Sequence, residues 1–115
     1  MPLLKLQTTA VVSPEKQAAL LAELSQIIAG TIGKPEQYVM VTAGPAAIQM
    51  SGRAGDAAFV EVRSIGGLNR EVNQRLAEKI CRALTAALGV PAARIYLNFA
   101  EVDAENWGWN GSTFG

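Results

Sequence analysis

The chain has 115 residues, the size of one ordinary domain, which we expect to span residues 1–115. Hydrophobic residues make up 50% of it and charged residues 17%, so it can bury a core and is not disordered. Ten Lys and Arg residues balance ten Asp and Glu residues, which argues against nucleic acid and against an anionic membrane surface as partners. No apolar stretch approaches the ~20 residues that cross a bilayer, and no secretory signal peptide is visible, so the sequence predicts a cytoplasmic protein.

Two scarce residue types limit the chemistry that this chain can perform. Histidine is absent, so the usual side chain for acid–base work near neutral pH is missing. Cys81 is the only cysteine, so neither an intrachain disulfide nor a cysteine-based zinc site can form, and we expect it to be a small buried residue. Proton transfer near pH 7 must therefore use a carboxylate, a lysine, a tyrosine, this thiol or the amino terminus.

The first half of the chain predicts a strand, a long helix and a second strand. Residues 1–8 have the pattern of a short strand. Ser13 is a helix cap followed by a proline and an acidic residue, and Gly33 with a proline two residues later ends that helix. The apolar face of the helix consists of Leu20, Leu24, Ile27, Ile28 and Thr31. Residues 38–42 have strand composition, and a short edge strand is expected near residues 48–50.

The second half repeats this order. Residues 57–64 alternate as a strand, and Asn69 is the expected cap of a second helix, which Gly89 ends. One face of that helix carries Val72, Leu76, Ile80, Leu84 and Leu88. Residues 94–99 form the last long strand, and Asn110-Gly111 is a strong signal for a two-residue hairpin.

The two halves predict an α/β fold with internal pseudo-symmetry. Each half contains a strand, a helix, a Gly-x-Pro stop and a strand, and Leu21-Ala22-Glu23 recurs as Leu76-Ala77-Glu78. Two such β-α-β units with right-handed crossovers give a four-stranded mixed sheet with two helices on one face, plus short edge strands. No third helix is available to cover the other face of the sheet, so we expect subunits to associate there.

Pro2 is the first candidate for chemistry. If Met1 is removed during synthesis, Pro2 becomes a free secondary amine at the amino terminus. An α-amino group has a pKa near ~8, and desolvation lowers that pKa toward the range in which a base works best at neutral pH. The alternative is that Pro2 merely begins a strand.

Four further residues could bind an oxygen. Lys34 could hold a carboxylate or an oxyanion, or could simply be a cation near a helix C-terminus. Tyr96 and Asn98 share one face of a strand and could donate hydrogen bonds to a carbonyl or carboxylate; the alternative is a surface or interface pair. The turn at Ile65 offers backbone N–H groups, although most such turns are only turns.

The tail of the chain is rich in aromatic residues. Trp107, Trp109 and Phe114 all lie within nine residues of the end. Aromatic side chains so placed are rarely left exposed. They can pack on their own subunit or pair with the sheet edge of a neighbouring subunit and wall a pocket there, and we favour the second arrangement.

Taken together, these motifs resemble the macrophage migration inhibitory factor (MIF) family of the tautomerase superfamily over the whole chain. The resemblance is carried by Met1-Pro2, Gly33-Lys34-Pro35-x-Gln37-Tyr38, Ser64-Ile65-Gly66, Arg94-Ile95-Tyr96-Leu97-Asn98 and Gly108-Trp109-Asn110-x-Ser112-Thr113-Phe114. It implies the tautomerase fold, a homotrimer whose three sheets enclose a channel, and an active site between two subunits. It implies neither a metal nor an organic cofactor.

The resemblance also implies an activity, that of a keto–enol tautomerase of the phenylpyruvate tautomerase or dopachrome isomerase type, acting on a small enol or keto acid. Pro2 would be the catalytic base, and Lys34 with the backbone of Ile65 would hold the substrate. Tyr96 and Asn98 would reach in from the adjacent subunit. The aromatic walls would be Tyr38, Trp109 and Phe114, with Trp107 at the rim.

The chain departs from the family pattern at three places. Animal members carry a Cys-x-x-Cys pair where this chain has Asp56-Ala57-Ala58-Phe59, so thiol–disulfide activity is not expected. Trp107 replaces a small aliphatic residue and Phe99 replaces a tyrosine. These last two changes affect substrate preference and rate more than the type of reaction.

Two other functions stay open as alternatives. One is a cytokine-like signalling protein that engages a receptor and has weak or vestigial catalysis. The other is a generic small-ligand-binding domain that assembles as a dimer. Because related proteins are exported without a signal peptide, export is an alternative to the cytoplasmic location.

Overall fold

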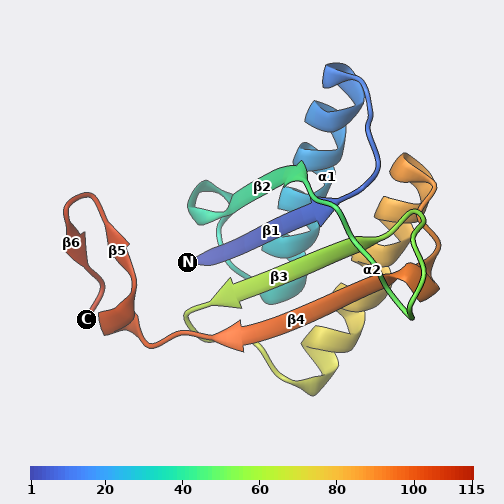
Figure 1. Ribbon diagram of the computed structural model, residues 1–115. Helices are drawn as coiled ribbons and strands as arrows, with labels where there is room; N and C mark the ends of the chain where they lie inside the picture. Colours follow the sequence, from blue (N-terminus) through green and yellow to red (C-terminus); the bar gives the residue numbers. More distant parts are fainter.

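Strands and helices follow one another in the order that the sequence predicts (Figure 1). The computed structural model describes residues 1–115. Its main elements are β1 (Pro2–Thr8), α1 (Pro14–Ile32), β2 (Met40–Pro45), β3 (Ala58–Ser64), α2 (Arg70–Leu88) and β4 (Ile95–Glu101). A small hairpin, β5 (Gly108–Trp109) and β6 (Ser112–Thr113), follows near the end of the chain. Neither long helix is apolar enough over its length to cross a membrane.

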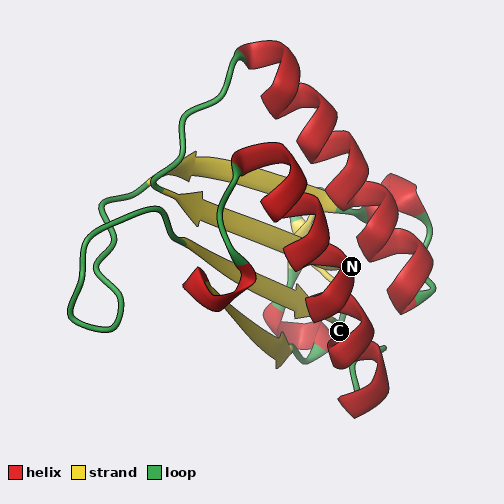
Figure 2. Cartoon of the chain, turned by 90° about the vertical axis from the view of Figure 1, so that its right-hand side faces the viewer, coloured by secondary structure: helices red, strands yellow, loops and turns green.

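The sheet is built from two β-α-β units placed side by side. The strand order is β2-β1-β3-β4; the outer pairs β1–β2 and β3–β4 are parallel, and the central pair β1–β3 is antiparallel. Both helices lie on the same side of the sheet (Figure 2). The predicted four-stranded mixed sheet with two helices on one face is confirmed. Because Pro2 pairs with Ser64 and Leu3 with Met40, the start of β1, the end of β3 and the start of β2 meet at one end of the sheet.

The predicted helix boundaries are confirmed because both helices are capped by local rules. The Ser13 side chain accepts a hydrogen bond from the Lys16 N–H, and the Asn69 side chain accepts one from the Val72 N–H. Each helix ends at a glycine in the left-handed region, Gly33 with φ of 81° and Gly89 with φ of 71°.

The core lies between the helices and one face of the sheet. Alternate residues of the two central strands are fully buried: Leu4, Leu6, Val60 and Val62. On α1 the buried position is Ile32 rather than the predicted Thr31, whose hydroxyl accepts a hydrogen bond from Lys79 at 3.2 Å. Cys81 is only partly buried; it packs against the core, and burial raises the pKa of its thiol, which favours the protonated form.

Two predicted strands differ from the observed structure. Residue 38 does not belong to a strand: Tyr38 ends a single 3₁₀ turn, in which its N–H donates to the Pro35 carbonyl, and the strand begins at Met40. The edge strand expected near residues 48–50 is absent, and only an isolated bridge joins Met50 and Arg53. The Arg94 guanidinium bonds four carbonyl oxygens of this segment, those of Met50, Arg53, Gly55 and Asp56. Hydrogen bonds from the Arg94 side chain therefore hold this segment in place of the backbone pairing that an edge strand would make.

The second face of the sheet carries no covering element, as expected. From the strand register, this open face carries Leu3, Lys5, Gln7, Met40, Thr42, Phe59, Glu61, Arg63, Tyr96 and Asn98. Met40 and Tyr96 are 62% and 65% exposed. Large side chains so exposed on a sheet face mark a surface that association can cover.

Candidate active site

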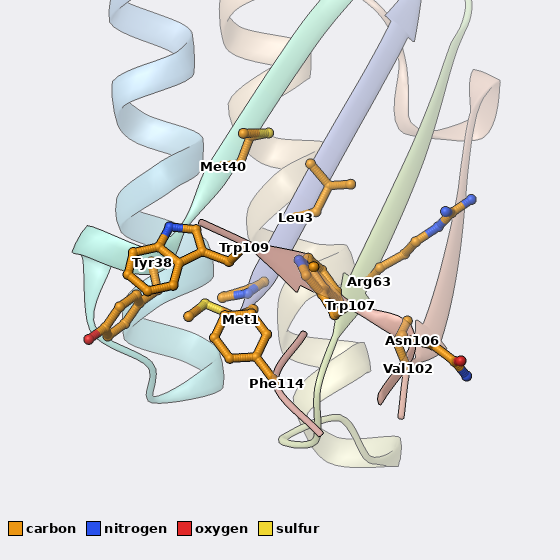
Figure 3. A pocket seen from close by; sticks show the side chains of 12 residues that line it. Met1, Leu3, Tyr38, Met40, Arg63, Val102, Asn106, Trp107, Trp109 and Phe114 are labelled. Carbon is orange, nitrogen blue, oxygen red and sulfur yellow. The ribbon is translucent and has the colours of Figure 1, made fainter. Parts of the chain in front are cut away.

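A cavity of about 450 Å³ lies at the end of the sheet where β1 begins (Figure 3). It is lined by Met1, Pro2, Leu3, Tyr38, Met40, Arg63, Val102, Asn106, Trp107, Gly108, Trp109 and Phe114. The cavity thus brings together the amino terminus, the turn before β2, the end of β3 and the tail. Five residues that the sequence singles out meet here: Pro2, Tyr38, Trp107, Trp109 and Phe114.

Pro2 forms the buried end of this cavity. Its side chain is fully buried, and its backbone pairs with Ser64 on the neighbouring strand β3. Directly after Ser64, the Ile65 N–H donates a hydrogen bond to the Met1 carbonyl at 3.4 Å. The turn therefore aims a backbone donor at the residue that precedes Pro2.

Local backbone geometry places this turn against the end of α1. Gly67 has φ of 84°, and a Cβ there would lie 2.7 Å from the Ile32 side chain, so only glycine permits the approach. Lys34 follows the glycine cap of α1, and its Nζ donates to the Ile65 carbonyl at 3.2 Å. Lys34 is not a lining residue of the cavity, but it is fixed beside the turn that adjoins Pro2.

The electrostatics of this end of the sheet favour an uncharged amine. Burial lowers the pKa of the Met1 amino group below its ordinary value of 8.0, and the positive charge of Lys34 lowers it further. That amine belongs to Met1, one residue before Pro2. Both causes oppose a positive charge at this position.

The tail forms an aromatic wall on its own chain. The predicted hairpin is confirmed: Asn110 and Gly111 have φ of 52° and 79°, which is the geometry of a type I′ turn. The Phe114 N–H donates to the Trp107 carbonyl at 3.1 Å. The rings of Trp109 and Phe114 are stacked with centroids 6.1 Å apart and an angle of 9° between planes. Tyr38 lies on the same side of the cavity in Figure 3.

Sequence reasoning missed one charged residue at the site. Arg63 lines the cavity because its strand β3 runs antiparallel to β1, which sets it opposite Leu3 and next to the partner of Pro2. No local motif contains Arg63. Only the pairing register of the two strands could have revealed it.

Two predicted residues lie away from the cavity. Tyr96 and Asn98 are exposed on the open face of β4 and do not line it. They do share one face of a strand, as the two-residue spacing predicts. In the single chain, both side chains are exposed and can contact another molecule.

The site offers proton transfer and hydrogen bonding, and its donor set is not that of a metal centre. No group of three His, Cys, Asp or Glu side chains is placed to hold a metal ion. The charged and hydrogen-bonding groups at or beside the cavity include the amino terminus, Arg63, Lys34, the Ile65 backbone and the side chains of Asn106 and Tyr38.

Comparison with known proteins gives one consistent result. The family model described as macrophage migration inhibitory factor (MIF) matches residues 1–115. A macrophage migration inhibitory factor homolog of Trichuris trichiura is 38% identical over 108 residues, covering 93% of this chain and 95% of the relative. The factor of Xenopus laevis is 36% identical over 96 residues, covering 83% and 84%.

Solved structures of such proteins have the same fold. The macrophage migration inhibitory factor-like protein of Entamoeba histolytica matches with a TM-score of 0.94 and 29% identity, covering 98% of each chain. The homologue of Prochlorococcus marinus matches with a TM-score of 0.92 and 40% identity, covering 98% of this chain and 99% of that one. This chain therefore belongs to the macrophage migration inhibitory factor family of the tautomerase superfamily.

Proposed function

We propose that this protein is a keto–enol tautomerase in which Pro2, freed by removal of Met1, is the general base. The proposal rests above all on the position of Pro2. Pro2 is fully buried and lines a cavity of about 450 Å³ whose other walls include aromatic side chains. Once Met1 is removed, the terminal amine of the chain lies at this cavity. Phenylpyruvate-type acids are the substrate class that we propose.

Removal of Met1 changes the nitrogen of Pro2 from an amide to a secondary amine. An amide nitrogen has no useful basicity, whereas an amine has a lone pair whenever it is unprotonated. In the chain with Met1, burial and the charge of Lys34 lower the pKa of the terminal amine, and we expect the same two causes to lower the pKa of the Pro2 amine and so to raise its neutral fraction. A base poised in this way suits a protein that has no histidine.

Two groups beside Pro2 are suited to hold the acid. Lys34 supplies a positive charge, and the Ile65 N–H supplies a hydrogen-bond donor. In the chain that carries Met1, the Met1 carbonyl oxygen accepts from this N–H. That oxygen occupies the place of a substrate oxygen, and its loss with Met1 frees the donor.

The reaction moves one proton between carbon and oxygen. The neutral Pro2 amine removes a proton from the carbon next to the substrate carbonyl, and the electrons of that C–H bond form the C=C bond of an enolate. The protonated amine then returns the proton to the enolate oxygen, which gives the enol; the reverse steps convert an enol into a ketone. Lys34 stabilises the negative oxygen as it forms. The stacked rings of Trp109 and Phe114 offer a surface for an aryl group.

We also propose that three chains form the active unit. The open sheet face leaves Tyr96 and Asn98 exposed, and neither contributes to the cavity of its own chain. In a homotrimer these two side chains of one subunit would complete the site of the next, where both can donate hydrogen bonds to a substrate oxygen.

The deciding experiment compares the protein with its Pro2→Gly variant on phenylenolpyruvate, after mass spectrometry has verified that Met1 is absent from both. The variant still begins with an amine, but a primary one on a more flexible backbone, so the base is no longer held in place and kcat/KM is expected to fall by about 100-fold, with the circular dichroism spectrum unchanged. Equal kcat/KM values for the two proteins would refute the proposal.

A further inference from the structure

Among the residues that line the cavity, Arg63 is the only one with a charged side chain. Tyr38 and Arg63 lie on opposite sides of it in Figure 3, and the guanidinium extends away from the aromatic cluster. No Asp or Glu lines the cavity, and the other cation of this end, Lys34, is held at the turn beside Pro2. Arg63, which is paired with Glu61, and Lys34 thus place two cationic side chains at different positions around the cavity.

Within one chain, the guanidinium of Arg63 has a single, weakly held partner. Its only hydrogen bond runs from one Nη to Glu61 at 3.3 Å, and the Arg63 side chain is 54% exposed. Exposed ion pairs of this kind are weak, so a ligand carboxylate can replace Glu61. The remaining N–H groups of the guanidinium form a planar fork that matches the two oxygens of a carboxylate.

We propose that Arg63 determines specificity by binding a second carboxylate of the substrate, remote from the oxygens held at Lys34 and Ile65. The preferred substrates are then enol or keto acids that carry two acidic groups. This inference rests on the proposed tautomerase function. Rotation about the side-chain torsions of Arg63 turns the guanidinium from Glu61 toward the ligand, while the aliphatic stem keeps its place in the cavity wall.

A pair of matched substrates tests the proposal. Phenylenolpyruvate and its para-carboxyphenyl analogue differ only in the distal carboxylate. The protein without Met1 is expected to prefer the dianion by about tenfold in kcat/KM, mainly through a lower KM. Arg63→Met is expected to bring the ratio of the two kcat/KM values close to one. Arg63→Lys keeps part of the preference, because it retains the charge but not the fork.

Arg75→Met is the matched control. Arg75 is an exposed cation of α2, which covers the other face of the sheet, and it does not line the cavity. Its loss removes the same charge and should leave the substrate ratio within twofold. The proposal is overturned if Arg63→Met keeps the ratio of the parent protein, if Arg75→Met lowers the ratio equally, or if the parent prefers the monoanion.

A binding experiment separates this proposal from the proposed catalysis. Cinnamate and para-carboxycinnamate cannot tautomerise, and their binding can be followed by the fluorescence of the cavity tryptophans Trp107 and Trp109. Tighter binding of the dianion that disappears in Arg63→Met supports the subsite even if Pro2→Gly leaves turnover unchanged. Equal binding of both acids by the parent protein overturns it, whatever the result with Pro2.

Discussion

The Ile65 N–H and the Met1 carbonyl oxygen are joined by a hydrogen bond of 3.4 Å, which ties the first residue of the chain to the turn after β3. Met1 also lines the cavity. A single residue thus converts the Pro2 nitrogen to an amide, occupies a backbone donor and fills part of the cavity. Its removal would therefore change the proposed base and the proposed oxygen-binding group together.

Protein that retains Met1 is therefore expected to have at least about 100-fold lower kcat/KM on phenylenolpyruvate than protein that begins at Pro2. The measurement pairs kinetics with intact-mass spectrometry on the same sample. Digestion of the retained form with methionine aminopeptidase should restore the activity in step with the loss of the methionine mass. Full activity in a sample whose mass includes Met1 would contradict the account.

Lys34→Gln is expected to shift the pH dependence of kcat/KM. The reacting amine must be deprotonated, so activity rises with pH through the pKa of that amine. Burial and Lys34 lower the pKa of the Met1 amine one residue away, and we expect them to act in the same direction on Pro2, so removal of the lysine charge should raise the pKa and move the rising limb to higher pH. KM should also rise, because a cation beside the substrate acid is lost. Lys16→Gln, at the opposite end of α1, is the control and should leave the profile in place; a shift to lower pH in Lys34→Gln would be incompatible with this role.

Mixed trimers test the shared active site. Pro2→Gly and Asn98→Ala proteins are each expected to be weakly active, because each lacks one half of every site. After joint unfolding and refolding, random assembly gives about a quarter of the sites an intact Pro2 from one chain and an intact Asn98 from its neighbour. Activity should recover to about that fraction of the parent value. If both residues act within one chain, the mixture gains nothing over the separate variants.

Arg94→Met is expected to destabilise the fold without touching the cavity. The guanidinium donates to four carbonyl oxygens of the segment between β2 and β3, one of them at 2.8 Å. Most of these bonds are exposed to water, so the expected loss is about 1–3 kcal/mol of unfolding free energy in urea denaturation. Arg82→Met on α2 removes an arginine that makes no such bonds and is the control. A stability equal to that of the parent protein would rule out this role.

What the sequence alone predicts correctly is governed by short-range rules. Both helices, with caps at Ser13 and Asn69, and the hairpin at Asn110-Gly111 depend on neighbouring residues, so a local pattern is enough. The repeat of strand, helix and Gly-x-Pro stop predicts the four strands of the mixed sheet and the two helices on one of its faces. Near residues 48–50 local composition was misleading, because the partner of that segment is Arg94, about 40 residues away.

The residues of the candidate site also differ in whether a local sequence pattern predicts them. Pro2, Tyr38, Trp107, Trp109 and Phe114 belong to recognisable motifs and do meet at the cavity. Arg63 belongs to none, and its place depends on the register between β1 and β3, which no window of sequence contains. Residue-level patterns also leave open which chain supplies Tyr96 and Asn98, because that depends on how the open sheet faces associate.

The central claim is that the amine of Pro2 is the base, and an NMR titration of its nitrogen tests this most directly. Protein without Met1 and labelled with ¹⁵N-proline gives one amine resonance whose shift follows its protonation. The account predicts an apparent pKa below the ~8 of a solvated α-amino group and equal to the pKa of the rising limb of kcat/KM. An amine that titrates at or above ~8, or at a pH unrelated to that limb, would contradict it.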